Sequence, residues 1–349
     1  MKKNYLFSDV VNLTLSEIMK FNKKTVLFGL GVDDPKGIFG TTRGLKEIYG
    51  KNRVFDMPAS ENAMTGVAIG MSLNNMIPIM CHQRMDFFLL AMDQLINNAA
   101  KWKYMFGGQQ KAPIIIRLIV GRGWGQGPTH SQNFQNMFAS IPGLKIYSPS
   151  FPSTIRNILH ASIKSSDPVL IIEHRWLHYM NEKIDFNTKP KKIECVKKIK
   201  SGKDLTIVSS SYSTFEILKI YNDLKKENIS IDLLDINMIK PFNLNVVYNS
   251  VKKTGRLLIL DNSVHEYCSF GGHIIAELVS REKNIFRKEP VNLNLPDIPS
   301  PTSHDLSKEF YNSSKDIIRE IGKLINKKIK LTKKLGKHDI PDPEFRGPF

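Results

Sequence analysis

Short runs of apolar residues alternate with amphipathic stretches along most of this chain. In the first half, the pattern predicts strands at 25–29, 77–81, 113–117, 144–147 and 168–172, and helices at 8–21, 61–73, 87–105 and 152–164. Apolar runs without strict alternation are typical of strands that are buried on both faces of a parallel sheet. The pattern therefore predicts an α/β fold, with a parallel sheet that carries helices on both faces.

A break in this pattern divides the chain. Residues 181–203 are rich in lysine, contain Pro190 and have few large apolar clusters, which is typical of a linker. A second series then predicts strands at 205–208, 231–235 and 257–261 and helices at 213–228, 274–278 and 313–326. We therefore divide the 349 residues into a first domain at 1–185, a linker at 186–202, a second domain at 203–327, and a basic, proline-rich, extended tail at 328–349.

Composition excludes several classes of protein. The formal net charge is +17, but the lysines are scattered, apart from one run between Lys323 and Lys337. This distribution favours a solvated surface or an acidic partner chain, and we predict no nucleic-acid partner. The chain has no apolar run long enough to cross a membrane. Its three cysteines are too far apart for a zinc site or a disulfide framework, so we expect no bound metal of its own and a cytoplasmic location.

Glu61 is the most informative single residue. It stands at the start of the predicted helix 61–73, directly after Ser60, which we expect to cap that helix through its hydroxyl. Met64, Val67, Ala68 and Met71 predict that this helix is buried. A carboxylate at such a position is poorly solvated and can act as an acid. The alternative is a charge that only complements the helix dipole, worth about 0.3–1 kcal/mol.

The glycine-rich stretch from Gly121 to Gly127 follows the end of a predicted strand and leads to His130. Strand ends in parallel sheets are places where ligands bind, and a histidine there can transfer protons. A structural histidine that caps the turn is the alternative. The stretch lacks the Lys-Ser/Thr pair of a phosphate-binding P-loop, so a phosphate role is weak.

Polar and aromatic residues also follow the strand at 77–81. Arg84 suits a carboxylate or phosphate group, His82 can face the same pocket, and Phe87 can stack on a flat heteroaromatic ring. The alternatives are a solvated sheet edge for His82 and Arg84 and a core position for Phe87. After the first strand, a Gly-X-Gly sequence is followed by Asp33 and Asp34, which would repel a pyrophosphate. We therefore expect no diphosphate site in this chain alone.

Several segments occur in the order that is found in one known family. They are Arg43-Gly44-Leu45, Pro58-Ala59-Ser60-Glu61, residues 91–101, 113–117, 130–132, 142–145 and 167–169, and more loosely 238–242 and 269–271. Together they resemble the beta subunit of the decarboxylating component of 2-oxo acid dehydrogenases of the pyruvate, branched-chain and acetoin types, as a divergent subgroup. The resemblance covers the chain from about residue 5 to residue 326.

The resemblance implies a transketolase-like pyrimidine-binding domain at 1–185 and a transketolase C-terminal domain at 203–327. It implies an alpha2-beta2 heterotetramer with thiamine diphosphate between two subunits, in which the alpha subunit holds the diphosphate and Mg²⁺ through a Gly-Asp-Gly motif. This chain contains no Gly-Asp-Gly. A lipoyl acyltransferase component is a further partner of such enzymes.

Residue by residue, the resemblance assigns Glu61 to the acid that shifts the aminopyrimidine ring to its imino tautomer. It assigns Phe87 to the ring that stacks on the pyrimidine, and His130 to a histidine near the thiazolium end. The implied reaction is decarboxylation of a 2-oxo acid, with transfer of the acyl group to lipoyl or another acceptor. Two other interpretations remain open, namely a split transketolase or carboligase that transfers to an aldehyde or ketone, and a non-catalytic beta-like subunit.

The chain departs from the family pattern at several places. Ser165-Ser166-Asp167 replaces an acidic potassium-binding stretch, so retention of that ion is open. Gly29-Leu30-Gly31-Val32 replaces Gly-Glu-Glu-Val, which puts a proton relay between sites in doubt. His82-Gln83-Arg84 and His174-Arg175-Trp176 also differ, and they indicate a larger or more polar substrate than pyruvate.

Overall fold

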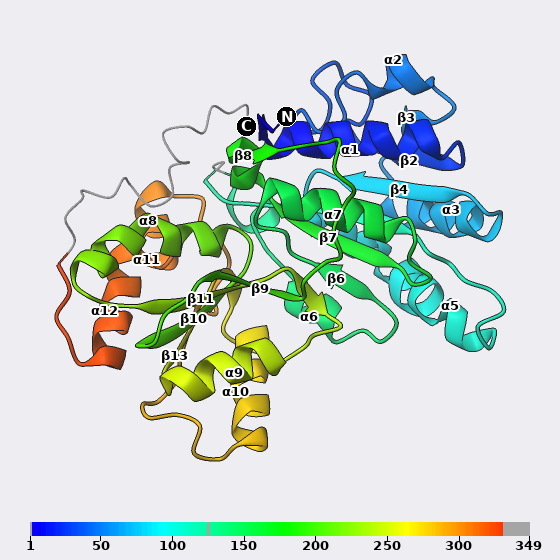
Figure 1. Ribbon diagram of the computed structural model, residues 1–349. Helices are drawn as coiled ribbons and strands as arrows, with labels where there is room; N and C mark the ends of the chain where they lie inside the picture. Colours follow the sequence, from blue (N-terminus) through cyan, green and yellow to red (C-terminus); the bar gives the residue numbers. More distant parts are fainter. Residues whose placement is uncertain (1, 124–125, 331–349) are drawn as a thin grey trace. The chain divides into compact units, whose positions relative to one another are not determined.

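The structure, a computed structural model, describes residues 2–123 and 126–330. These residues form two compact units (Figure 1). The first unit comprises residues 2–120 and 137–193, and the second comprises residues 121–123, 126–136 and 194–330. The second unit thus includes a short segment that lies in the middle of the first half of the sequence.

A parallel sheet forms the centre of the first unit. Its strands follow the order β6-β7-β5-β4-β2-β3. They are β2 (Thr25–Gly29), β3 (Val54–Asp56), β4 (Ile77–His82), β5 (Ile115–Val120), β6 (Lys145–Tyr147) and β7 (Val169–His174). Every residue of β2, β5 and β7 is buried, as expected for central strands that are covered on both faces.

Helices and a small second sheet complete this unit. The helices are α1 (Phe7–Phe21), α2 (Leu45–Tyr49), α3 (Glu61–Leu73), α4 (Met85–Phe88), α5 (Ala100–Met105) and α7 (Pro152–Ser162), with a 3₁₀ helix, η4, at Arg175–Tyr179. The short helix α6 (Gln135–Ala139) is divided between the units, because its first two residues belong to the second unit. Helices α1 and α7 pack against each other (Figure 1). Strand β1 (Lys3–Leu6) pairs antiparallel with β8 (Asn181–Ile184). The pairing joins the first described residues to the end of this unit.

The helix predicted at 87–105 is more varied than the sequence indicated. After α4, the chain forms a 3₁₀ turn, η1 (Leu89–Ala91), then a π-helical stretch, η2 (Gln94–Ala99), and then α5. The 3₁₀ and π-helical stretches are only 3 and 6 residues long, which is too short for the apolar pattern to distinguish their periods from that of an α-helix. Short π-helical stretches inside helices often occur near functional sites.

The second unit contains another α/β sheet, in the order β14-β13-β10-β11-β9. The strands are β9 (Val196–Lys200), β10 (Leu205–Ser209), β11 (Ile231–Ile236), β13 (Leu257–His265) and β14 (Val291–Leu295), with β12 (Met238–Lys240) as a further short strand. The helices are α8 (Tyr212–Lys226), α9 (Asn245–Thr254), α10 (Phe270–Arg281), α11 (His304–Phe310) and α12 (Ser314–Ile325). Apolar side chains of β10, β11 and β13 pack with those of α8 and α12 to form the core.

Strand β9 lies inside the segment that was predicted as a linker, 186–202. It pairs antiparallel with β11, although its own sequence, Val-Lys-Lys-Ile-Lys, is strongly polar. A strand at a sheet edge can carry many lysines because one side faces water. The domain boundaries at 185, 202 and 327 stay predictions, and the tail predicted at 328–349 lies outside the described residues beyond residue 330.

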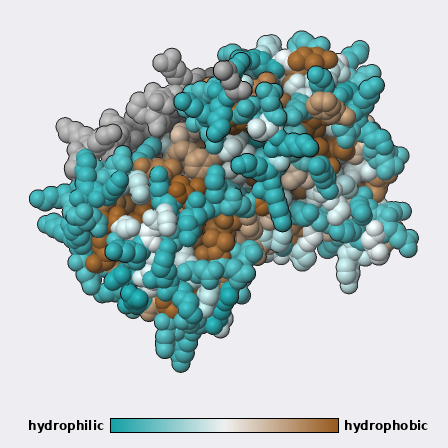
Figure 2. Space-filling view, in the orientation of Figure 1, coloured by the Kyte–Doolittle hydropathy of each residue, from teal (hydrophilic) through white to brown (hydrophobic). Residues whose placement is uncertain are grey.

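Within the described residues, no helix is both long and apolar enough to span a membrane. Hydrophilic residues cover most of the face that is drawn in Figure 2. This agrees with a chain whose scattered lysines are solvated.

Candidate active site

The strands of the first sheet end at a common edge. Gly29 at the end of β2 lies opposite Asp56 of β3 and Cys81 of β4, and Cys81 lies opposite Arg117 of β5. Because these strands are parallel, the segments that leave their carboxyl ends begin at the same edge of the sheet. Glu61 follows β3, and His82, Arg84 and Phe87 lie at or after the end of β4. The fold therefore brings four of the five predicted site residues to one edge.

Glu61 is the first residue of α3 and is only 7% exposed. Its carbonyl oxygen accepts a hydrogen bond from the Thr65 hydroxyl at 2.9 Å. Among the described residues, its carboxylate has no hydrogen-bond or ion-pair partner. The side chain lies almost entirely out of water, and a ligand that donates a hydrogen bond would satisfy this carboxylate where the protein does not. This side chain is therefore the strongest single candidate for contact with a bound group.

The predicted capping role of Ser60 is wrong. Ser60 is the residue before α3, but its side chain forms no capping hydrogen bond. Its backbone N–H instead donates to the Pro58 carbonyl oxygen at 2.7 Å, in a tight turn that holds Ser60 away from the usual capping conformation. Glu61 thus begins the helix without competition from a capping hydroxyl.

Helix α3 is also less buried than its apolar residues indicated. Met64 and Ala68 are buried, but Val67 is 48% exposed. The buried face packs on β4 and on the turn η1 that follows α4. The packing brings the helix that carries Glu61 against β4, which carries His82, and against η1, which directly follows the helix α4 that carries Phe87.

His82 ends β4 and is buried, which excludes a solvated sheet edge at this position. Its ring lies 4.9 Å from the ring of Phe88, and its Nε2 has no hydrogen-bond partner within the described part of the chain. Burial lowers the pKa of His82 to about 4, so the imidazole is neutral at physiological pH. A neutral, buried imidazole can donate or accept one hydrogen bond to a ligand.

Phe87 and Phe88 are adjacent in α4 but face different surroundings. Phe88 is fully buried between His82 and Phe138, with its ring centre 6.0 Å from that of Phe138. Phe87 is 38% exposed. The core position that was the alternative for Phe87 is therefore taken by Phe88, and a large part of the Phe87 ring is accessible to a ligand.

Arg84 is buried and shares an aromatic neighbour with Arg175, which sequence reasoning did not place there. The Arg84 guanidinium carbon lies 5.5 Å from the centre of the Phe39 ring, and that of Arg175 lies 4.3 Å from the same ring. Arg84 donates to the Gln83 carbonyl oxygen at 2.8 Å, and Arg175 donates to the Tyr179 hydroxyl at 2.9 Å. Burial, assisted by the positive charge of Arg175, lowers the pKa of Arg84 to about 10.

One available signal pointed to Arg175. It directly follows β7, which lies two strands from β4 in the sheet, so both arginines leave the same edge. Two guanidinium groups around one aromatic ring create a strongly positive region. Such a region suits an anionic group.

Asp56 is a further residue that the sequence did not single out. Its carboxylate accepts backbone N–H groups of Gly31 at 2.9 Å, Val32 at 2.6 Å and Asp33 at 3.2 Å, and so fixes the loop after β2. The carboxylates of Asp33, Asp34 and Asp56 lie within 4.8 Å of one another. However, Asp33 pairs with Lys46 at 2.5 Å and Asp56 is occupied by the backbone, so we assign no metal to this cluster.

His130 belongs to the segment of the second unit. It follows a 3₁₀ turn, η3 (Gly127–Thr129), and its N–H donates to the Gly127 carbonyl oxygen at 3.2 Å. Its Nδ1 lies 2.8 Å from the Thr129 hydroxyl oxygen. Gly127 has a φ of +54°, and a Cβ there would lie 2.1 Å from Oγ1 of Thr302. The turn before His130 thus requires glycine at position 127. Gly125 of the same loop lies outside the described residues.

The two halves of the chain match two family models. The transketolase pyrimidine-binding domain matches residues 4–179, and the transketolase C-terminal domain matches residues 194–317. The structure also resembles a solved split-gene transketolase described as an inactive beta4 tetramer, with a TM-score of 0.73 over 92% of this chain and 98% of that one. The sequences are only 20% identical, so this likeness supports the fold alone.

Sequence relatives are more specific. The chain is 31% identical over 311 residues to the pyruvate dehydrogenase E1 component subunit beta of Rickettsia bellii, which covers 89% of this chain and 95% of the relative. It is 31% identical over 296 residues to the acetoin:2,6-dichlorophenolindophenol oxidoreductase subunit beta of Cupriavidus necator, which covers 84% and 87%. The predicted α/β fold, with its two transketolase-like domains, is confirmed. The chain belongs to the transketolase-like family that contains the beta subunits of the pyruvate dehydrogenase E1 component and of acetoin oxidoreductase.

Proposed function

We propose that this chain is the beta subunit of a thiamine diphosphate-dependent 2-oxo acid dehydrogenase, which decarboxylates a 2-oxo acid and passes the acyl group to lipoyl or another acceptor. The observation that carries the proposal is the buried Glu61 carboxylate, which has no donor among the described residues. Family membership supports the same reaction class.

The residues of the first unit fit an aminopyrimidine ring. Such a ring offers N–H donors at its edge and a flat face. Glu61 supplies a carboxylate that needs a donor, and Phe87 supplies a partly exposed aromatic face. When bound, thiamine diphosphate supplies the carbon nucleophile that attacks the keto group and the electron sink that allows carbon dioxide to leave.

Glu61 acts on the cofactor and not on the substrate. Its carboxyl oxygen holds a proton against a ring nitrogen, and the water-poor position at the start of α3 keeps that interaction strong. Phe87 orients the ring by stacking. His130 donates or accepts a proton at the reacting end, from one of its ring nitrogens.

Substrate contact is assigned to His82 and Arg84. The guanidinium of Arg84, with Arg175 around the same Phe39 ring, favours the carboxylate of a 2-oxo acid. Neutral His82 offers a hydrogen bond within a buried position. Both assignments rest on the electrostatics of the sheet edge.

A second chain completes the proposed site. Asp33 and Asp34 follow the first strand, where a diphosphate-binding loop would need the opposite charge, and the sequence has no Gly-Asp-Gly. We therefore assign the diphosphate and Mg²⁺ to an alpha subunit in an alpha2-beta2 heterotetramer, with a lipoyl acyltransferase component as a further partner. The cytoplasmic location and the absence of a nucleic-acid partner stay predictions.

Reconstitution with the alpha partner tests the proposal. The complex is assayed with a series of 2-oxo acids, with ferricyanide as the oxidant in one arm and aldehydes as acceptors in the other. We expect carbon dioxide release that requires thiamine diphosphate and is lost in Glu61→Gln, but is kept in Glu47→Gln, which alters an exposed carboxylate of the same unit.

Each outcome of this assay decides one part of the proposal. A fully active Glu61→Gln complex would refute the role of Glu61. Tight binding of thiamine diphosphate by the isolated chain would refute the shared site. Product formation only with aldehydes would replace the dehydrogenase with a carboligase.

A further inference from the structure

The segment that carries His130 is held by residues far away in the sequence. Residues 121–123 and 126–136 follow β5 of the first unit, yet they belong to the second unit. We call residues 121–123 and 126–136 the His130 segment. Its position must therefore be fixed by side chains that lie about a hundred residues further along the chain.

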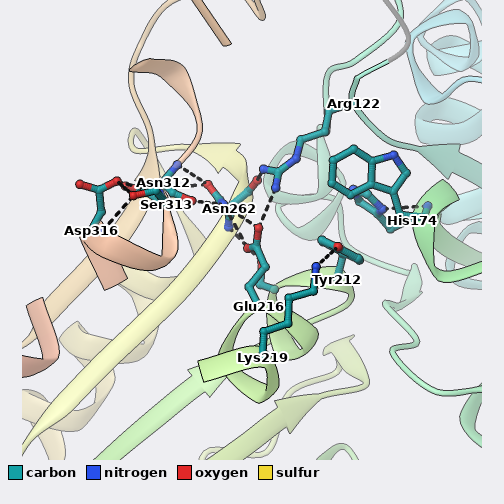
Figure 3. Close-up of polar contacts among 11 residues, drawn as sticks. Arg122, His174, Tyr212, Glu216, Lys219, Asn262, Asn312, Ser313 and Asp316 are labelled. Carbon is teal, nitrogen blue, oxygen red and sulfur yellow. Dashed lines mark hydrogen bonds and ion pairs between the residues drawn. The ribbon is translucent and has the colours of Figure 1, made fainter. Parts of the chain in front are cut away.

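Arg122 makes the strongest contact at the start of this segment. Its Nη2 donates to Oε1 of Glu216 at 2.6 Å, and its Nη1 donates to the Asn262 carbonyl oxygen at 3.3 Å (Figure 3). Arg122 and Glu216 are 4% and 5% exposed. The Arg122 guanidinium also lies 4.2 Å from the centre of the Tyr311 ring. A buried, charge-assisted contact of this kind is strong and directional.

The acceptor side of this contact is itself fixed. The Asn262 side-chain amide donates to both Glu216 carboxylate oxygens, at 3.1 and 3.0 Å (Figure 3). The Asn312 backbone N–H donates to Oδ1 of Asn262 at 2.9 Å. One hydrogen-bond network thus joins helix α8, strand β13 and Asn312, which lies just before α12. This network leaves the Glu216 side chain little freedom to move.

The end of the His130 segment is fixed to the same strand. The side-chain amide of Gln135 donates to the carboxylate of Asp261, and Oδ1 of Asn136 accepts the Phe270 N–H at 3.2 Å. Asp261 and Asn262 are consecutive residues of β13. One short stretch of this strand therefore holds the segment on both sides of His130.

We propose that Arg122 and Glu216 are positioning residues for His130. This inference rests on the proposed function, because it assigns to the pair the task of keeping a proton-transferring imidazole in place. The pair itself does not touch the reacting atoms. A displacement of roughly 1 Å at a reacting group can lower a rate by about a hundredfold, so loss of the Arg122 anchor, eight residues before His130 in the sequence, should lower turnover.

The variant Glu216→Gln tests the pair in the complete complex. It keeps the side-chain shape and one acceptor oxygen but leaves the Arg122 charge without its carboxylate. We expect hydrogen exchange of backbone amides at 126–136 to rise by about tenfold. We expect kcat to fall by about tenfold or more, while KM for the 2-oxo acid and the Kd of thiamine diphosphate change little.

Asp232→Asn is the matched control. Asp232 is a fully buried residue of the same unit. Its carboxylate accepts hydrogen bonds from Lys253 at 2.7 Å and Ser250 at 2.6 Å, and among the described residues it has no hydrogen bond or ion pair with the His130 segment. Its loss should destabilise the second unit without a selective rise in exchange at 126–136 and without a fall in kcat. Arg122→Lys keeps the positive charge, so its amides at 126–136 should exchange more slowly than those of Arg122→Met. This pair of variants replaces Glu216→Gln in the test if that variant does not fold.

Unchanged exchange at 126–136 in Glu216→Gln would overturn the inference, as would a rise spread equally over the second unit. A fall in kcat of the same size in Asp232→Asn would also overturn it. Failure of the proposed function would look different. The wild-type complex would then release no carbon dioxide, while the selective change in exchange would still be measured.

Discussion

The guanidinium of Arg117 and the carboxylate of Glu173 form a two-point ion pair between the adjacent strands β5 and β7. The nitrogen–oxygen distances are 2.6 and 2.8 Å, and neither side chain is exposed. Cys81 accepts from the same guanidinium at 3.4 Å, and Nε2 of His178 lies 3.4 Å from Oε2 of Glu173. A charged cluster therefore lies buried among the central strands of a largely apolar sheet.

Removal of one partner from this pair should be strongly destabilising. Glu173→Gln leaves the Arg117 charge buried without compensation, and we expect the free energy of unfolding to fall by about 3–5 kcal/mol at neutral pH. Urea unfolding measures this loss. Glu47→Gln, which alters an exposed carboxylate of the same unit, should change the free energy of unfolding by less than about 0.5 kcal/mol.

The same pair gives a defined pH dependence. Burial alone would raise the pKa of Glu173, but the charge and hydrogen bonds of Arg117 outweigh it and lower the pKa to about 2. The stabilisation is therefore complete above the ordinary value of 4.5 and is lost as the pH falls towards 2. If the difference in free energy of unfolding between wild type and Glu173→Gln stayed constant between pH 4.5 and 2, this assignment of the lowered pKa to Glu173 would be contradicted.

His82 should make the protein less stable below neutral pH. Its pKa of about 4, lowered from 6.5 by burial, means that the unfolded chain binds a proton that the folded chain rejects. Stability is thus fully present above pH 6.5 and falls between pH 6.5 and 4. His82→Phe keeps the packing on Phe88. In this variant we expect the free energy of unfolding to change less with pH in this range, by up to about 1.4 kcal/mol per pH unit, than in the wild type. The exposed His273 is the control position, and an equal effect of His273→Phe would count against the assignment.

Phe87 should contribute to cofactor affinity. Loss of aromatic stacking in Phe87→Ala should raise the Kd of thiamine diphosphate for the complex roughly two- to twelvefold, which corresponds to about 0.5–1.5 kcal/mol of stacking energy. Titration calorimetry measures this change. Leu90 lies one turn later and is 68% exposed, so Leu90→Ala should leave the Kd unchanged. Equal effects at both positions would remove the assigned role of Phe87.

The side chains of two lysines contact the turn at 165–167, where the sequence left potassium binding open. Lys103 contacts Ser166 at 3.0 Å and Asp167 at 2.8 Å, and Lys145 contacts Ser165 at 3.1 Å and Asp167 at 3.2 Å. Their ammonium groups already supply positive charge to these oxygens. We expect the same Tm in KCl and in NaCl at equal ionic strength. A stabilisation specific to potassium would contradict this prediction.

The sequence predicted most accurately the features that depend on local signals. The helix 61–73 begins and ends where α3 does, because the Pro58-Ala59-Ser60 turn precedes it and an apolar pattern continues through it. It also placed Phe87 directly after the strand predicted at 77–81, and Phe87 lies in α4, just after the end of β4. Local patterns therefore sufficed for the scaffold of the candidate site.

The features that the sequence did not reveal depend on residues that are distant in the chain. Arg84 and Arg175 both lie near the ring of Phe39, and the strand order places both arginines at one edge of the sheet, but the sequence around neither of them indicates their shared contact with Phe39. The π-helical stretch at Gln94–Ala99 has a side-chain pattern close to that of an ordinary helix. His130 followed a strand of the first half in the sequence, and only three-dimensional packing assigns its segment to the second unit.

The Arg122–Glu216 pair has a consequence for hybrid proteins. A chimera that is joined near residue 194, between the two matched family regions, would take Arg122 from one parent and Glu216, Asp261 and Asn262 from the other. Each parent domain could then fold well by itself while the loop with His130 lost its anchors. Exchange of the C-terminal half between relatives should therefore succeed only when residues 121–136 are exchanged with it.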